Sequence, residues 1–135
     1  MVTYLSDVSH IPDDIWAMFD NSPGGSVPPL FILDCLRPEP HPSHYGIAES
    51  VATARRMDAQ RTYWTGFSHE LTHEDWVAIG EALGGRTDIK EGLRPVARMA
   101  LEKVEGSDSF WVRPSFDGLK ISISRDGDIR DGEYF

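Results

Sequence analysis

Two features of the sequence predict an α/β fold, in which helices pack on a sheet that contains parallel strands. Residues 30–35 are a continuous apolar run closed by Asp34, which is typical of a strand buried on both faces. Residues 47–57 then repeat apolar side chains at helical spacing, and residues 61–66 are rich in β-branched and aromatic side chains. Residues 30–66 therefore predict a strand–helix–strand unit, which nearly always joins parallel strands by a right-handed crossover.

Shorter elements precede this unit. Residues 2–7 predict a strand that ends in the carboxylate of Asp7. A helix start is indicated at residues 11–14, where a proline takes the first helical position and two acidic side chains complement the helix dipole. Residues 21–29 are mostly turn formers and predict a surface loop.

The C-terminal region predicts a helix followed by a hairpin. Residues 95–104 form a short amphipathic pattern with a proline near its start. Residues 110–113 and 118–123 predict strands on either side of a Phe-Asp-Gly turn. Residues 125–135 carry mixed charge and two Asp-Gly pairs, so we expect this tail to be solvated or frayed.

Composition limits the class of protein. The chain has 135 residues, 40% hydrophobic and 26% charged, which suits one soluble domain or part of a larger one. No apolar run approaches the roughly 20 residues that span a bilayer and no signal-peptide pattern opens the chain, so we expect a cytoplasmic protein without a membrane partner. A net charge of −9 disfavours nucleic acid as a partner, unless a metal or a local basic patch intervenes. The single cysteine, Cys35, excludes an internal disulfide and is expected to be a buried small hydrophobe.

Residues 69–73 spell His-Glu-x-x-His, a motif that in zinc peptidases places two histidines on one helical turn. The surrounding sequence favours another structure. Residues 61–67 predict a strand and a turn, where a peptidase would already be helical, and Thr72 lies three residues before an aspartate, as in a capping box. We therefore expect His69 in a loop and His73 in the first turn of a helix, without a shared face.

Four residues at or just after predicted strand ends could act together: Asp7, Asp34, His44 and His69. In open α/β sheets, ligands and metal ions gather where strand ends meet loops. Carboxylates combined with neutral imidazoles suit zinc or manganese. Three prolines stiffen residues 37–44 and could hold a histidine in place. The alternative is structural: the aspartates would cap a helix or bond local amides, and the histidines would be ordinary loop residues.

Five short motifs occur in an order that resembles the second half of the metallo-β-lactamase fold, and most closely its phosphodiesterase-like branch, such as the bacterial cyclic phosphodiesterases of phosphonate breakdown. They are Tyr-Leu-Ser-Asp at 4–7, Leu-Asp-Cys at 33–35, His-Pro-Ser-His at 41–44, Thr-Gly-Phe-Ser-His at 65–69 and Phe-Asp-Gly-Leu at 116–119. The resemblance covers residues 2–85 and 110–123, and 86–109 look like an insertion. It implies that residues 1–124 form the C-terminal half of an αββα sandwich, a mixed sheet with flanking helices, followed by the charged tail.

The resemblance also implies roles for single residues. Asp7 would bridge two metal ions, zinc or manganese, and His69 would be a further metal ligand. His44 would protonate the leaving group, since an imidazole titrates near neutrality. Asp34 and His73 would support the site from behind.

Two departures from the family pattern concern the metal. Gly66 stands where the branch has a metal-binding histidine, so either His69 substitutes or a ligand is lost. The main metal signature, His-x-His-x-Asp-His, does not occur in the chain, and the half that carries it would lie before Met1.

We therefore expect the C-terminal part of a metal-dependent hydrolase that acts on a small-molecule phosphodiester or related ester, and the isolated chain could be inactive. One alternative is a catalytically silent structural or interaction domain, which the lost ligands favour. Another is a zinc peptidase, favoured only by His-Glu-x-x-His. Half a sandwich would leave apolar positions such as Val2, Tyr4, Leu30 and Ile32 uncovered, so self-association through an exposed sheet edge is also expected.

Overall fold

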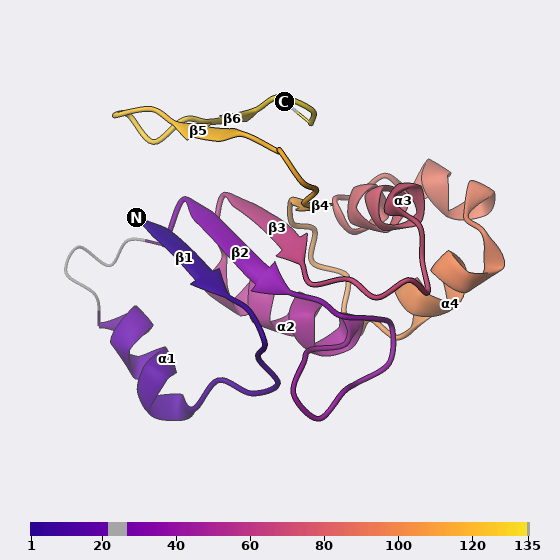
Figure 1. Ribbon diagram of the computed structural model, residues 1–135, viewed down its shortest axis with the longest axis horizontal. Coiled ribbons are helices and arrows are strands. Elements are labelled where there is room, and N and C mark those ends of the chain that lie inside the picture. Colours follow the sequence, from indigo (N-terminus) through magenta and orange to yellow (C-terminus); the bar gives the residue numbers. More distant parts are fainter. Residues whose placement is uncertain (22–26, 135) are drawn as a thin grey trace.

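The computed structural model describes residues 1–21 and 27–134, and its centre is a sheet of four parallel strands in the order β1-β2-β3-β4 (Figure 1). The strands are β1 (Val2–Leu5), β2 (Leu30–Asp34), β3 (Arg61–Thr65) and β4 (Val112–Pro114). The register aligns Val2 with Leu30, Leu30 with Arg61, and Thr62 with Val112. Because the strands are parallel, their carboxyl ends share one edge of the sheet.

The two central strands have the buried positions that their apolar sequences predict. Phe31 and Leu33 of β2 and Tyr63 and Trp64 of β3 are fully buried. Helix α2 (Ile47–Met57) connects the two strands, so the predicted strand–helix–strand unit is confirmed. The fold is α/β, with a parallel sheet and flanking helices.

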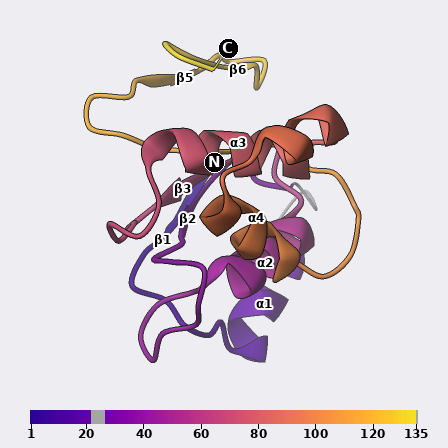
Figure 2. The same ribbon diagram turned by 90° about the vertical axis from the view of Figure 1, so that its right-hand side faces the viewer.

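The helices pack on one face of this sheet and around its β4 edge, beside which α3 lies (Figures 1 and 2). They are α1 (Asp13–Asp20), α2, α3 (His73–Leu83), the 3-10 helix η1 (Thr87–Gly92) and α4 (Pro95–Glu102). Trp16 of α1 packs in one buried cluster with Phe31 of β2, and Trp76 of α3 packs in another with Trp64 of β3. No helix in the described part of the chain is long and apolar enough to cross a membrane.

The opposite face is covered by an antiparallel pair, β5 (Ile121–Ile123) and β6 (Ile129–Asp131) (Figure 1). The predicted hairpin between residues 110–113 and 118–123 is wrong, because β4 pairs with β3 and β5 pairs with β6. The expectation of a solvated or frayed tail is wrong for β6, because Ile129 is only 2% exposed and packs against the sheet. Ile129 is the one apolar residue of β6 and has charged neighbours, so the sequence shows no alternating pattern that would predict this strand.

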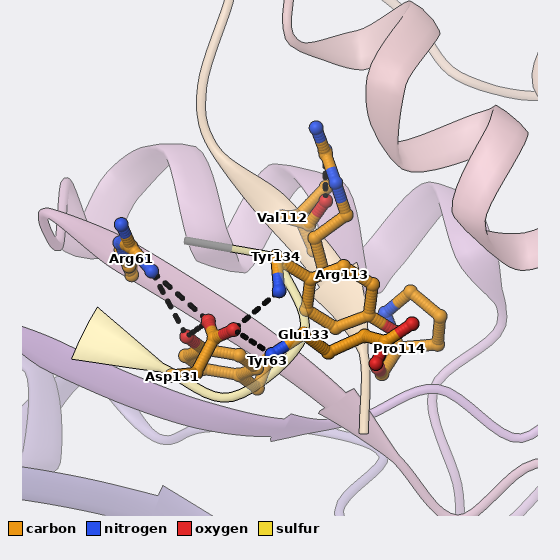
Figure 3. Close-up of polar contacts among 8 residues, drawn as sticks. All are labelled: Arg61, Tyr63, Val112, Arg113, Pro114, Asp131, Glu133 and Tyr134. Carbon is orange, nitrogen blue, oxygen red and sulfur yellow. Dashed lines mark hydrogen bonds and ion pairs between the residues drawn. The ribbon is translucent and has the colours of Figure 1, made fainter. Parts of the chain in front are cut away.

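Asp131 fastens the C-terminal segment to the sheet (Figure 3). Its Oδ2 accepts hydrogen bonds from Arg61 Nη1 at 3.0 Å and from the Tyr63 hydroxyl at 2.5 Å. Its Oδ1 accepts the backbone N–H groups of Glu133 and Tyr134. Burial of the phenol, together with its bond to the Asp131 carboxylate, raises the pKa of Tyr63 to about 12, so the phenol remains a donor at neutral pH.

The edge strand β1 has no such cover on the hairpin side. Val2 is 50% exposed and Tyr4 is 59% exposed, as expected for a sheet edge that lacks a neighbour. Leu30 is only 4% exposed, so the expectation that it would be uncovered is wrong, since the β5–β6 pair covers it.

Candidate functional site

The candidate site lies at the edge where the parallel strands end. Asp34 is the last residue of β2 and is 1% exposed, whereas Asp7 follows β1 and has an exposed side chain. Asp7 has a positive φ of 52°, an uncommon conformation for a residue with a side chain, although aspartate tolerates it better than most. The strand ends therefore place one buried and one exposed carboxylate at the same edge.

His44 lies between these two carboxylates. Its Nδ1 is 2.8 Å from Asp34 Oδ2, and its Nε2 is 3.6 Å from Asp7 Oδ1. Asp34 Oδ2 also accepts the backbone N–H of Val8 at 3.3 Å, which ties the segment after β1 to the end of β2. A carboxylate accepts from Nδ1 only if that nitrogen carries the proton, so Asp34 orients the ring and leaves Nε2 facing Asp7.

The proline-containing segment before His44 holds it in place through its own bonds. The backbone N–H of Leu36 donates to the carbonyl of Tyr45 at 3.0 Å, which closes the loop at its base. His41 Nδ1 accepts from the backbone N–H of Ser43 at 3.2 Å. Of the two histidines in this segment, His44 is therefore the one that contacts both carboxylates. His41 instead forms a hydrogen bond within the loop.

Gly66, the first residue after β3, approaches Asp34 so closely that no side chain fits. Its φ is +82°, and a Cβ at this position would lie less than 3.0 Å from Asp34 Oδ1. The carboxylate of Asp34 thus occupies the space that a side chain at position 66 would need. A glycine here, where the resemblance leads one to expect a histidine, follows from the geometry of the buried aspartate.

His69 is at the same edge but makes no described bond to the other site residues. The backbone N–H of its neighbour Ser68 donates to the carbonyl of Leu36 at 2.7 Å, so the loop after β3 runs beside the end of β2. His69 itself is exposed, and within the described residues no hydrogen bond or ion pair joins it to Asp7, Asp34 or His44.

The His-Glu-x-x-His stretch is not helical throughout, which removes the basis for a peptidase. Helix α3 begins at His73, with Thr72 as its cap. Thr72 Oγ1 accepts the backbone N–H of Asp75 at 3.2 Å, and the Asp75 carboxylate accepts the N–H of Thr72 at 3.0 Å, as the predicted capping box requires. His69 lies before this helix, so the two histidines do not share a helical turn.

His73 takes part in a different cluster from the one at the strand ends. Its Nε2 is 3.1 Å from the hydroxyl of Tyr134, which in turn donates to the carbonyl of Pro114 at 2.8 Å. Its ring also stacks edge-on with Phe116. His73 therefore supports the C-terminal segment, a role that its position in the sequence did not reveal.

Cys35 follows Asp34 and is fully buried, as expected for a small hydrophobe. Burial, and next the charge of Asp34, raise the pKa of the Cys35 thiol well above its ordinary value. The thiol therefore remains protonated at neutral pH and is not a nucleophile of this site.

A metal centre cannot be assembled from the described residues alone. Within residues 1–21 and 27–134, no group of three or more His, Cys, Asp or Glu side chains is arranged to hold a metal ion. One oxygen of Asp34 is already bonded to His44 and Val8, and the position of Gly66 offers no ligand. The described residues do not fit the two-metal site that the resemblance implies.

Comparison with known proteins gives a match among solved structures. No protein-family model matches the chain, and no curated protein matches it. Among solved structures, it is similar to a new diphosphatase from the PhnP family, with a TM-score of 0.55 and 27% sequence identity over 91% of this chain. The chain spans only 35% of that protein. The α/β fold described above is thus similar, over most of its length, to one part of a metallo-β-lactamase-fold protein of the PhnP family.

Proposed function

We propose that this chain is the C-terminal part of a metal-dependent hydrolase that cleaves phosphodiester or related ester bonds in a small molecule, with His44 as the proton donor to the leaving group. The observation that carries the proposal is the position of His44 between buried Asp34 and exposed Asp7 at the carboxyl edge of a parallel sheet. The similarity to a diphosphatase of the PhnP family supports a phosphorus ester as the substrate class.

The role of His44 follows from its two nitrogens. Nδ1 donates to the Asp34 carboxylate, which fixes the ring, and Nε2 lies at the edge where a substrate would approach. When the bond from phosphorus to the leaving oxygen breaks, a proton on Nε2 can pass to that oxygen, so that an alcohol leaves in place of an alkoxide. Asp34 is then a positioning residue, because it acts only through His44.

The metal of such a hydrolase, zinc or manganese, would need ligands from outside the described residues, because these residues contain no ligand group of three or more. We propose that residues 1–124 correspond to the C-terminal half of the complete domain, with residues 86–109 as an insertion. Asp7 would be the carboxylate that this half contributes to the metal site. His69 would replace the ligand that Gly66 cannot supply.

A second candidate function is a catalytically silent interaction domain. The observation that favours it is the same shortage of metal ligands, together with an uncovered β1 edge whose Tyr4 is 59% exposed. This edge would allow two copies of the chain to pair strand to strand.

Hydrolysis of bis(p-nitrophenyl) phosphate with zinc or manganese tests the two candidates, and it is measured on a protein in which this chain is joined to the half that would supply the remaining metal ligands. If His44 is the proton donor, His44→Ala should lower kcat by a factor of about 10² to 10⁴, whereas His10→Ala, at an exposed histidine outside the site, should not change it. Asp34→Asn should lower kcat and change the pH profile while leaving KM unaltered. Hydrolysis that is absent, or equal in the wild type and His44→Ala, would favour the silent domain.

A further inference from the structure

A cleft of about 360 Å³ lies at the opposite edge of the sheet from His44. Helix α2 runs back from the carboxyl edge, so Arg55 in its last turn lies near the strand starts, and residues 105–109 lead directly into β4. Figure 2 shows this connection passing from α4 around α2 towards the sheet. The cleft is lined by these parts together with the end of α3, η1 and α4. Its volume is within the range of small-molecule sites.

The cleft is unusual for this chain in its charge. The chain has 22 acidic and 13 basic residues, yet among the residues that the structure describes the cleft is lined by two cations, Arg55 and Lys90, and by no acidic side chain. The other cavities described each include at least one carboxylate. Asp88, beside the cleft in sequence, is paired with Arg86 at 3.0 Å. The cleft therefore attracts anions against the overall charge of the protein.

Arg55 builds one wall and retains donor capacity. Its Nε donates to the carbonyl of Asp108 at 2.9 Å, and its Nη1 donates to the carbonyl of Glu105 at 2.5 Å. Arg55 thus contacts the two acidic residues of this connection through their backbone carbonyls, and neither residue lines the cleft. Arg55 Nη2 and the Lys90 ammonium have no acceptor within the described residues, so both cations can bind a ligand.

Neutral donors complete the lining. Thr87, Ser107 and Ser109 also line the cleft, and each of them carries a hydroxyl group. The backbone N–H groups of residues 106–109 donate to no acceptor in the part of the chain that the structure describes. Leu101 and Val104 provide an apolar side. Two cations, several hydroxyls and free amides are more donors than the two oxygens of a carboxylate require, whereas a phosphate group has three terminal oxygens to satisfy.

We propose that this cleft binds a small phosphate monoester, with the phosphate held by Arg55, Lys90 and the 106–109 connection and the organic group packed against Leu101 and Val104. The site lies at the sheet edge opposite to Asp34 and His44, so the proposal does not depend on the function proposed for those residues. Its ligand would bind without being cleaved.

Phenyl phosphate is a suitable probe, titrated into the ¹⁵N-labelled chain and followed by amide chemical shifts. We expect shifts at residues 106–109 that saturate, and a dissociation constant about tenfold weaker in Lys90→Gln, because one charge-assisted contact to the phosphate is lost. Lys120→Gln removes the same charge at an exposed position outside the cleft and should leave the dissociation constant unchanged.

Three results would overturn the proposal. One is the absence of shifts at residues 106–109 at millimolar phenyl phosphate. Another is an equal loss of affinity in Lys90→Gln and Lys120→Gln, which would indicate non-specific attraction. The third is equally strong binding of phenol or benzoate, since phenol tests the apolar wall alone and benzoate tests an anion without a third oxygen. Wild-type binding with unaltered His44 signals would show that the cleft acts separately from the candidate hydrolase site.

Discussion

Gly66→Ala provides a direct test of how tightly the end of β3 packs on Asp34. The new Cβ would lie less than 3.0 Å from Asp34 Oδ1, so the buried carboxylate would have to move. Movement would weaken its bonds to His44 Nδ1 and to the backbone N–H of Val8. The variant should therefore lose stability and release the His44 ring at the same time.

The magnitude follows from two contributions. A residue with a Cβ in the left-handed region, where Gly66 has φ +82°, is destabilised by about 1–2 kcal/mol. Weakening hydrogen bonds to a buried charged group adds about 1.5–3 kcal/mol. Gly118 is a matched control, because its φ is +89° and a Cβ there would meet nothing within 4 Å. Gly118→Ala should thus show the first contribution alone.

Urea denaturation followed by circular dichroism measures both variants. We expect Gly66→Ala to lower the free energy of unfolding by about 2.5–5 kcal/mol and Gly118→Ala by about 1–2 kcal/mol. The His44 ring signals should shift in the first variant only. Equal losses in the two variants would refute the close packing of Gly66 on Asp34.

Three further predictions concern the buried acid, alkaline pH and metal. Asp131→Asn should lower the free energy of unfolding in urea by about 3 kcal/mol, because it removes the buried charge that pairs with Arg61, whereas Asp128→Asn, at an exposed ion pair, should change it by less than about 1 kcal/mol. The pKa of Tyr63 is raised from 10.0 to about 12, so the contribution of this phenol to the free energy of unfolding is complete below pH 10 and is lost as the pH rises to 12. When the free energy of unfolding is measured as a function of pH, Tyr63→Phe should lose less of it at alkaline pH than the wild type does. Zinc or manganese should leave the thermal midpoint unchanged, because the described residues contain no ligand group, and a clear rise would contradict this.

The sequence predicted those parts of the fold that depend on local pattern. The β2–α2–β3 unit could be predicted because a strand buried on both faces is apolar throughout, as residues 30–33 are. The start of α3 could be predicted because Thr72 and Asp75 cap it with their own side chains. Strand pairing was not predictable in the same way: β4 and β5 are neighbours in sequence, but β4 finds its partner in β3, far along the chain.

In the candidate site, too, the features that depend on local sequence could be predicted, and those that depend on the packing of distant segments could not. Position after a strand end was enough to single out Asp7, Asp34 and His44, which the structure brings into contact. Which carboxylate orients the ring, and which is exposed, depends on burial, and burial depends on how the strands are ordered in the sheet. The contact between Gly66 and Asp34 joins two different strand ends, so the sequence showed only that a histidine was missing there, without the physical reason.

The sheet register also has a consequence for folding kinetics. Each pair of strands in the four-stranded parallel sheet joins residues that are distant in the chain, such as Leu30 with Arg61 and Thr62 with Val112, so each of these pairings must first close a long loop. Such topologies fold slowly, and the β3–β4 pairing, which has the longest connection, should form last. Until β4 is in place, the chain that leads into the β5–β6 pair is not held beside the sheet, and the apolar face around Tyr63 stays open to other chains. Dilute refolding conditions should therefore favour the monomer.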